Sequence, residues 1–318
     1  MARLSVPGNI LLLGEYAVLE EGGLGLAMAV DRRISVETSA HNGLLIEGSW
    51  QGRVTSWTRE SVSENPVAAA AVQVVESWLS SWGLPMDGWN TRLSIDSSPF
   101  FADSGGKIGL GSSAAVAIGL VCGLLAASTA PEAARSPDVL RLALEAHRNA
   151  QGGSGSGYDV SCSFHGGIGL FRGGAEPSWE PCTVPTDPVI ILFQGPRPVL
   201  TREAVKRFFQ WKKRNPGPAR RFLVESNRAI LDFVRAGSQE EALLHFNACR
   251  QIGISLGDAI GFPAHLSVPR GLDPAWCKAV GAGNELAACL LPRSSPLPAS
   301  DGRVLRVLPS EKGVLWEE

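Results

Sequence analysis

Residues 105–115, Gly-Gly-Lys-Ile-Gly-Leu-Gly-Ser-Ser-Ala-Ala, combine glycine and serine in a pattern that suits phosphate binding. Glycines allow backbone conformations that turn several N–H groups toward one anion. An uncharged helix after them directs the positive end of its dipole to the same place. The hydroxyls of Ser112 and Ser113 can add hydrogen bonds or a magnesium ligand. Because the spacing matches neither the P-loop nor the dinucleotide fingerprint, we expect a phosphate loop of another kind. The alternative is a glycine turn in which Ser112 N-caps a core helix.

A second glycine-rich run, residues 151–159, ends in a single carboxylate at Asp159 just before an apolar segment. A carboxylate held there can orient a hydroxyl nucleophile or accept its proton in phosphoryl transfer. The alternative is an aspartate that caps a turn. A third run, residues 280–285, predicts by itself only a tight turn. Since each run adjoins an apolar element, the three together indicate a functional site rather than turns that only connect helices and strands.

Basic side chains near these runs are candidates for contact with anions. Lys107 precedes the first loop and can meet a phosphate, while Arg32, Arg33 and Arg197 follow predicted strands and can bind an anionic substrate. We expect His147 to be a helix residue that faces the site or solvent rather than a ligand. The six cysteines include no CxxC pair, so we expect reduced thiols.

Apolar periodicity places these candidates on a mixture of strands and helices. Apolar or alternating runs predict strands at 9–13, 26–30, 34–38, 44–47, 53–58, 91–95, 189–193, 287–291 and 304–308, with a strand pair around 160–171. Helical spacing predicts helices at 66–82, 112–127, 137–150, 201–213, 219–236 and 240–254, the first capped by Asn65. Because strands and helices do not alternate strictly, the pattern favours an α+β fold.

Length and charge limit the classes of function. A chain of 318 residues suits one large or two medium domains, and a proline-rich stretch over 175–188 places the boundary at residue 180, giving domains 1–180 and 181–318. With 29 Lys and Arg against 31 Asp and Glu, no global charge attracts nucleic acid or an anionic membrane. The uncharged run 108–130 is too rich in small residues for a membrane span, and no signal-peptide pattern opens the sequence. We therefore expect a cytoplasmic protein without nucleic-acid or membrane partners.

The three runs, with residues 7–19 (Pro-Gly-Asn-Ile-Leu-Leu-Leu-Gly-Glu-Tyr-Ala-Val-Leu), resemble the GHMP small-molecule kinases, named for galactose, homoserine, mevalonate and phosphomevalonate. The Gly-Leu-Gly-Ser-Ser-Ala-Ala sequence at 109–115 is the most specific part and matches that family's ATP-phosphate loop without a departure. Residues 7–19, residues 29–33 and the Gly-Ser-Gly-x-Asp-Val of 155–160 are most similar to the phosphomevalonate kinase branch.

The resemblance implies an N-terminal domain like ribosomal protein S5 domain 2, a ferredoxin-like C-terminal domain, and ATP and Mg²⁺ as cofactors. It implies that the nucleotide is held by Lys107, Gly109, Leu110, Gly111, Ser112, Ser113, Ala114, Gly281 and Gly283. Asp159 is implied as the catalytic carboxylate, with Glu15 and Asn9 as the other residues of the reaction centre. The implied acceptor-binding residues are Arg32, Arg197 and Ser156.

The chain departs from the family where Asn9 replaces a frequent lysine, which in those kinases lowers the pKa of the catalytic aspartate. Asparagine carries no charge, so activation of Asp159 has to come from elsewhere. The glycine run of the third motif is also replaced, since Asn284 and Glu285 follow Gly283.

The metal ligands implied by the resemblance are Ser113 and a carboxylate about ten residues before Asp159. Because Arg148 occupies that position, Glu145 is the local candidate.

The expected function is ATP-dependent phosphorylation of a small acceptor, with phosphomevalonate as the first choice. Its nucleophile is already an ionised phosphate oxygen, so a weak base suffices and charge neutralisation does most of the work. A mevalonate or sugar kinase of the same fold stays open, as does a catalytically silent regulator that binds nucleotide or metabolite. The expected partner is a small-molecule acceptor, and the expected state is monomer or homodimer.

Overall fold

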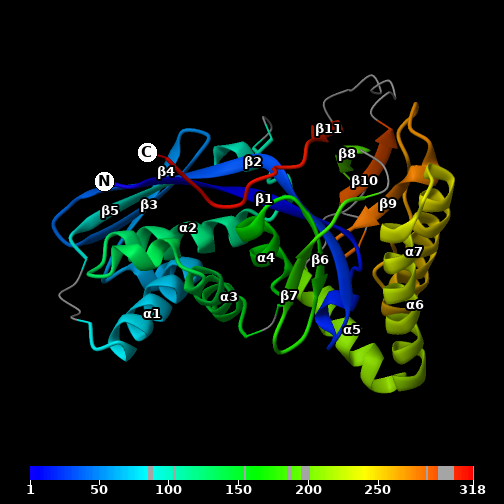
Figure 1. The fold of residues 1–318 in the computed structure, drawn as a ribbon, viewed down its shortest axis with the longest axis horizontal. Helices are drawn as coiled ribbons and strands as arrows, with labels where there is room; N and C mark the ends of the chain where they lie inside the picture. The colour runs from blue at the N-terminus through cyan, green and yellow to red at the C-terminus, as the bar shows by residue number, and fades with distance from the viewer. Residues whose placement is uncertain are drawn as a thin grey trace. The chain divides into compact units, whose positions relative to one another are not determined.

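The computed structural model describes residues 1–84, 89–102, 105–153, 155–184, 188–194, 201–283, 286–292 and 304–317. Helices and strands are mixed along the chain, as the α+β prediction requires (Figure 1). The chain forms two compact units. Unit 1 comprises Met1–Asn9, Ala29–Gly167 and Ser310–Glu318, and unit 2 comprises Ile10–Met28 and Ile168–Pro309. The division of the sequence at residue 180 stays a prediction.

Unit 1 is built on a sheet whose strands follow the order β12-β1-β2-β5-β3-β4. These strands are β1 (Arg3–Leu13), β2 (Leu24–Ala40), β3 (Leu44–Trp50), β4 (Arg53–Thr58), β5 (Thr91–Asp96) and β12 (Leu315–Glu317). β3 runs parallel to β5, and β12 runs antiparallel to β1. β1 and β2 continue from unit 1 into unit 2. β2 is one strand where the sequence predicted two, because the polar residues 31–33 interrupt the apolar pattern without ending the extended backbone.

The helices of unit 1 lie on one side of this sheet (Figure 1). They are α1 (Pro66–Ser81), α2 (Ser112–Ala126), α3 (Asp138–Ala150) and α4 (Tyr158–His165). Asn65 caps α1 as predicted, accepting hydrogen bonds from the amides of Val67 and Ala68. α2 carries no charge because it is almost entirely buried, and a Cβ at its Gly119 would lie 2.7 Å from the side chain of Val36.

Residues 158–165 form the helix α4, so the strand predicted around residue 160 is wrong. Gly157, with φ of 87°, turns the chain into the helix, and four consecutive residues, 160–163, are then buried. A strand buried on one face alternates instead, which the sequence alone did not decide. Only the later part of the predicted pair becomes the strand β6 (Ile168–Arg172). Asp159 therefore lies in the first turn of a helix.

Unit 2 contains an antiparallel sheet in the order β11-β8-β10-β9. Its strands are β8 (Pro188–Gln194), β9 (Cys277–Val280), β10 (Leu286–Pro292) and β11 (Val304–Val307), and its helices are α5 (Thr201–Arg214), α6 (Pro216–Arg235) and α7 (Gln239–Ile260). In the same unit, β6 pairs with residues 24–28 of β2 and with β7 (Ser178–Pro181). α7 is longer than predicted and ends at Gly261, whose φ is 77°. Nowhere in the described ranges is a helix both long and apolar enough to cross a bilayer.

Cys277 and Cys289 form a disulfide, so the expectation of six reduced thiols is wrong for this pair. The two residues are direct partners across the antiparallel strands β9 and β10. A separation of 12 residues does not reveal that register, which depends on strand pairing. Burial raises the pKa of the thiol of Cys122 to about 12.

Candidate functional site

The phosphate loop predicted in unit 1 leads directly into α2. Gly111 is the N-cap residue of the helix and has a left-handed backbone with φ of 66°, and Gly109 has φ of 88°. Ser112 is the first helical residue rather than the cap, and within the described residues no side chain accepts the amides of the first turn. These N–H groups and the positive end of a 15-residue uncharged helix suit an anion.

The other loop residues divide into buried and accessible positions. Leu110 and Ala114 are buried, whereas the side chain of Ser113 is exposed. The carbonyl of Leu110 accepts a hydrogen bond from the backbone N–H of Asn9 at 3.0 Å. Lys107 is exposed, with Nζ 6.0 Å from the centroid of the Phe101 ring.

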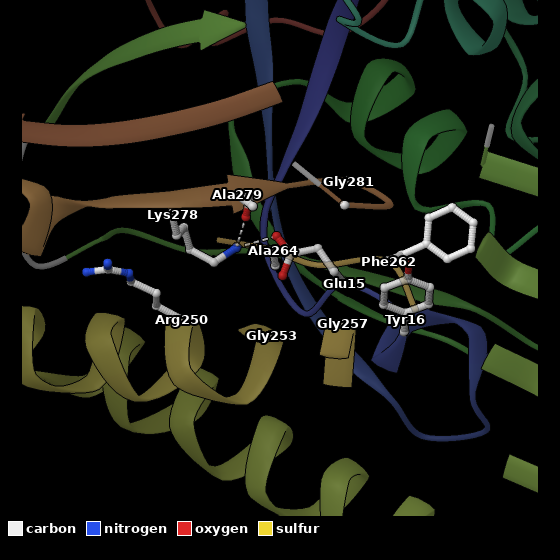
Figure 2. Close-up of a pocket in the computed structure, with 11 residues that line it drawn as sticks. Glu15, Tyr16, Arg250, Gly253, Gly257, Phe262, Ala264, Lys278, Ala279 and Gly281 are labelled. Carbon is white, nitrogen blue, oxygen red and sulfur yellow. Dashed lines mark hydrogen bonds and ion pairs between the residues drawn. The ribbon is translucent and has the colours of Figure 1, made fainter. Parts of the chain in front are cut away.

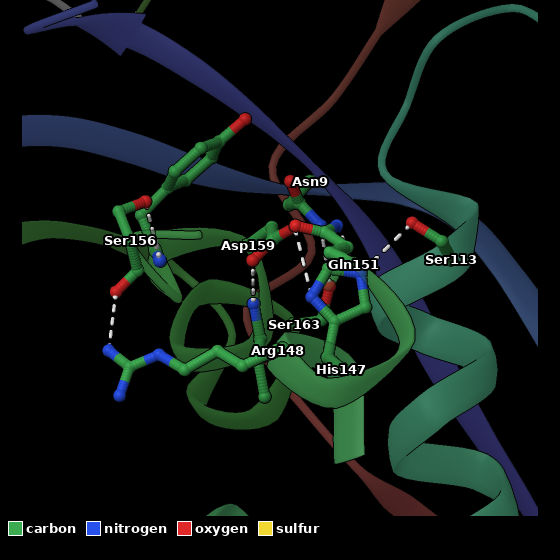
Figure 3. Close-up of polar contacts among 10 residues, drawn as sticks. Asn9, Ser113, His147, Arg148, Gln151, Ser156, Asp159 and Ser163 are labelled. Atoms are coloured by element: carbon green, nitrogen blue, oxygen red, sulfur yellow. Dashed lines mark hydrogen bonds and ion pairs between the residues drawn. The ribbon is translucent and has the colours of Figure 1, made fainter. Parts of the chain in front are cut away.

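His147 on α3 lies between the phosphate loop and the candidate catalytic carboxylate (Figure 3). Its Nε2 is 3.2 Å from Oγ of Ser113, and its Nδ1 is 3.6 Å from Oδ2 of Asp159. His147 is only 3% exposed, while the carboxylate of Asp159 is 20% exposed. Asp159 also accepts a hydrogen bond from the amide of Val160 at 2.9 Å. The structure thus brings Ser113 and Asp159 together through a buried imidazole.

Asn9 connects the phosphate loop to α4. Its Nδ2 donates to Oγ of Ser163 at 2.9 Å, and the side chain is 1% exposed. A Cβ at Gly111 would lie 2.2 Å from that Nδ2, so glycine is required beside the amide. Oδ1 of Asn9 is buried and accepts no hydrogen bond from any described group. Position 9, where the resemblance implies a lysine, is thus filled by a side-chain amide packed against the loop.

Arg148 lies one residue after His147 and points to the second glycine run. Its Nη2 donates to the carbonyl of Ser156 at 3.0 Å, while Oγ of Ser156 accepts from the amide of Tyr158 at 3.4 Å. Glu145, the second predicted metal ligand, is exposed on α3, and the α3 residue that reaches Ser113 is His147. Across the described ranges, no three His, Cys, Asp or Glu side chains gather as a metal site would need.

Unit 2 holds a second cluster, which contains Glu15 and the third glycine run (Figure 2). The ammonium of Lys278 donates to the carboxylate of Glu15, to the carbonyl of Leu12 at 3.1 Å and to the carbonyl of Ala279 at 2.7 Å. Lys278 is 2% exposed. Burial raises the pKa of Glu15 above its ordinary value, and the charge of Lys278 opposes that rise.

Tyr16 attaches the N-terminal motif to the third glycine run. It has a left-handed backbone with φ of 64°, and its hydroxyl donates to the carbonyl of Ala282 at 2.6 Å. Gly281 and Gly283 line a small cavity of about 20 Å³ beside Glu15 and Tyr16. Tyr16 therefore holds the third glycine run in place within unit 2.

The structure places the basic residues predicted to bind an anionic substrate in different environments. Arg33 donates to Oγ of Ser5 and Oγ of Ser310, each at 2.9 Å, and to the carbonyl of Gly313, so it holds the backbone rather than facing a substrate. Arg32 is half-buried. Arg197 lies outside the described residues.

Sequence reasoning missed Lys278, and it gave His147 only as a helix residue that faces the site or solvent. His147 and Gln151, the C-cap residue of α3, are four residues apart and lie on the same side, a spacing that could have marked the pair. Lys278 is the single charged residue of the buried strand β9, which is the signal of a paired buried charge.

Comparison with known proteins finds a family match within unit 1. Residues 102–167, which include the phosphate loop and Asp159, match the family described as GHMP kinases N terminal domain. A mevalonate kinase of Aeropyrum pernix is 29% identical over 180 residues, which are 55% of this chain and 52% of that protein. A phosphomevalonate kinase of Saccharolobus solfataricus is 30% identical over 171 residues, which are 53% of this chain and 48% of that protein. The chain thus spans about half the length of the curated relatives it matches.

Solved structures share the fold over nearly the whole chain. The Lin0012 protein of Listeria innocua has a TM-score of 0.78 at 19% identity and covers 99% of both chains. Streptococcus pneumoniae phosphomevalonate kinase, solved in complex with phosphomevalonate and AMPPNP, has a TM-score of 0.70 at 17% identity and covers 92% of both chains. The chain therefore contains a segment that matches the GHMP kinases N terminal domain, is related at low identity to mevalonate and phosphomevalonate kinases, and shares a two-domain α+β fold with these solved structures.

Proposed function

We propose that the chain is an ATP-dependent kinase that transfers a phosphoryl group to phosphomevalonate. The observation that carries the proposal is the arrangement in unit 1, where an uncapped helix N-terminus and a carboxylate flank one buried imidazole. Positioning and charge stabilisation dominate phosphoryl transfer, and this arrangement offers both. The relatives named above include kinases of both mevalonate and phosphomevalonate, so they support the kinase class without choosing the acceptor.

The residues of unit 1 fit a nucleotide with its metal. The amides after Gly111 would bind phosphate oxygens, and the exposed hydroxyl of Ser113 would be a magnesium ligand with Asp159 nearby. One hydroxyl and one carboxylate suit Mg²⁺, which keeps several waters and binds substrate phosphates. When bound, ATP supplies the phosphoryl group and Mg²⁺ neutralises its charge. Glu15 and Lys278 of unit 2 would support the third loop rather than take part in the chemistry.

Two features favour an acceptor that is already anionic. Asn9 supplies no positive charge to activate Asp159, and a phosphate oxygen needs less activation than an alcohol. Arg148 places a guanidinium at the position where the resemblance implies a second carboxylate. This guanidinium donates to the carbonyl of Ser156 in the second glycine run. A positive charge there favours phosphomevalonate over mevalonate or a neutral sugar.

A coupled assay of ADP release over mevalonate, phosphomevalonate, homoserine and a panel of sugars tests the proposal. We expect turnover with phosphomevalonate and little with mevalonate. A preference for mevalonate or a sugar would replace the acceptor and keep the kinase class. Tight ATP binding without turnover on any acceptor would instead indicate the silent regulator, which the buried Asn9 and the altered third glycine run favour. An enzyme that consumes ATP in this way is expected in the cytoplasm, as a monomer or homodimer.

A further inference from the structure

We infer that His147 positions the carboxylate of Asp159 for the acceptor, in place of the lysine that Asn9 replaces, an inference that rests on the proposed kinase function. His147 comes from α3 and Asp159 from the first turn of α4. The imidazole is the side chain that the structure brings to within 3.6 Å of Oδ2 of Asp159. Its role would be to hold the orientation of that carboxylate, without contact with the acceptor itself.

The neighbours of Nε2 fix where the imidazole carries its proton. Nε2 of Gln151 lies 3.1 Å from Nε2 of His147 (Figure 3), and an amide nitrogen can only donate. With the Gln151 amide in this orientation, Nε2 of a neutral imidazole is the acceptor and the ring proton lies on Nδ1. That N–H faces Asp159. The distance of 3.6 Å is longer than a formed hydrogen bond, and such bonds often tighten only when substrate binds.

The same protonation state explains the contact with Ser113. Because Nε2 is an acceptor with one lone pair, the Gln151 amide and the Ser113 hydroxyl, the latter at 3.2 Å, share it as hydrogen-bond donors. The lone pairs of Ser113 Oγ then remain available to bind a cation or to accept a hydrogen bond from a water molecule beside the phosphates. One buried imidazole thus orients two groups of the site, Ser113 at the phosphate loop and Asp159 at the acceptor side.

The other groups around Asp159 do not supply this orientation. Asn9 donates to Ser163 and packs against Gly111. Arg148 directs its Nη2 to the carbonyl of Ser156. The thiol of Cys162, on the same helix as Asp159, is fully buried, and burial raises its pKa well above the ordinary value. The amide of Val160 binds Oδ1 of Asp159, which leaves Oδ2 to His147.

The test compares His147→Ala and His147→Asn with the unchanged protein in the coupled phosphomevalonate assay. Asparagine places an amide N–H close to the position of Nδ1, whereas alanine removes the donor. We expect kcat to fall about 10²-fold in His147→Ala, because misplacement of a reacting group by about 1 Å costs that much. We expect His147→Asn to recover most of the loss, with KM for ATP within about threefold of the unchanged protein. His165→Ala, at the other end of α4, is the matched control and should keep kcat.

A double-mutant cycle shows whether His147 acts through Asp159. In an Asp159→Asn background, removal of His147 should change kcat by less than about threefold, since the group it orients is no longer a carboxylate. An equal loss in both backgrounds, or full kcat in a folded His147→Ala protein, would overturn the inference. So would a His147→Asn protein that is as impaired as His147→Ala.

A spectroscopic measurement separates this inference from the proposed function. Long-range ¹H–¹⁵N spectra of histidine-labelled protein should show His147 with a proton on Nδ1 and none on Nε2. This result is expected even if no acceptor is phosphorylated, in which case the proposed function fails and the placement of the proton still stands. A proton on Nε2 would overturn the inference whatever the enzyme assay gives.

Discussion

At the scale of single residues, Asp159 combines partial exposure with contacts to both a backbone amide and an imidazole. Asp159→Asn keeps the size of the side chain and removes its basicity. We expect turnover to fall by roughly 10²–10⁴, nearer the low end for a phosphate acceptor. Nucleotide affinity, measured by calorimetry, should change little. Full turnover in the variant would show that Asp159 has only a structural role in the first turn of α4.

Asn9 offers the sharpest contrast between this chain and the kinases it resembles. Asn9→Lys places an ammonium where the amide is 1% exposed and packed against Gly111. A buried unpaired charge costs about 3–5 kcal/mol, so we expect a lower Tm and no gain in turnover. Thermal unfolding and the phosphomevalonate assay check the two parts.

Asn9→Ala is the control for the loss of the amide contact with Ser163. A lysine variant that is both stable and faster than the unchanged protein would show that position 9 still serves Asp159 directly.

At the scale of elements, the start of α2 depends on glycine for two reasons that act together. Gly111 has φ of 66°, and a Cβ there would overlap the amide of Asn9. We expect Gly111→Ala to lose ATP affinity by at least tenfold and to unfold at a lower temperature, since both the backbone and Asn9 must shift. Gly106→Ala, where a Cβ meets nothing within 4 Å, should bind ATP normally. Equal affinities of the two variants in calorimetry would remove residue 111 from the site.

The buried pair in unit 2 gives a pH-dependent prediction. Lys278→Met leaves Glu15 without its cation, and burial already holds the pKa of Glu15 above its ordinary value. A raised folded-state pKa means that the protonated form is favoured in the folded protein. Stability is therefore kept below the unfolded pKa of about 4.3 and lost as pH rises through the folded pKa.

We accordingly expect the difference in unfolding free energy between Lys278→Met and the unchanged protein to grow from pH 5 to pH 8, toward about 3–5 kcal/mol. Urea unfolding at several pH values measures it. A difference that stays constant with pH would mean that Glu15 ionises equally in the folded and unfolded chains.

Local sequence signals predicted the elements well where one period dominates. The cap at Asn65, the uncharged α2 and the hairpin of β3 and β4 all follow from neighbours in the sequence. The signals failed where long-range pairing decides the structure. Small consecutive residues around Val160 suit a strand or a short helix equally, and the opposition of Cys277 to Cys289 depends on the register of two strands.

The candidate site was predicted in part for the same reason. Residue type and spacing mark the glycine turns and Asp159 as candidates in the sequence, and their roles stay predictions. The contacts of His147 and Lys278 depend on partners that are distant in the sequence. Ser113 is 34 residues from His147, and Glu15 is 263 residues from Lys278. Arg33 shows the converse, since a basic residue placed as if for substrate is occupied by backbone carbonyls and serines.

At the scale of the whole molecule, unit 1 is assembled from three separate stretches of chain. Arg33, in the second of them, joins all three through its bonds to Ser5, to Ser310 and to the carbonyl of Gly313. We expect Arg33→Ala to cost about 1.5–3 kcal/mol, the range for hydrogen bonds to a charged group, and to lower Tm by several degrees. Arg32→Ala, the next residue along β2, is the control and should leave Tm nearly unchanged. Calorimetry that shows equal effects would contradict the joining role.

The strand β12, which closes the edge of β1 in unit 1, has a consequence for biosynthesis. A ribosome makes β1 first and must then translate residues 14–314, which include unit 2's larger stretch, before β12 exists. At about 5–20 residues per second, the outer edge of β1 is left without its partner for roughly 15–60 s. An open strand edge is a template for pairing with other chains. The nascent protein therefore passes through an interval in which its first strand needs shelter, and codons that slow translation after residue 167 lengthen that exposure.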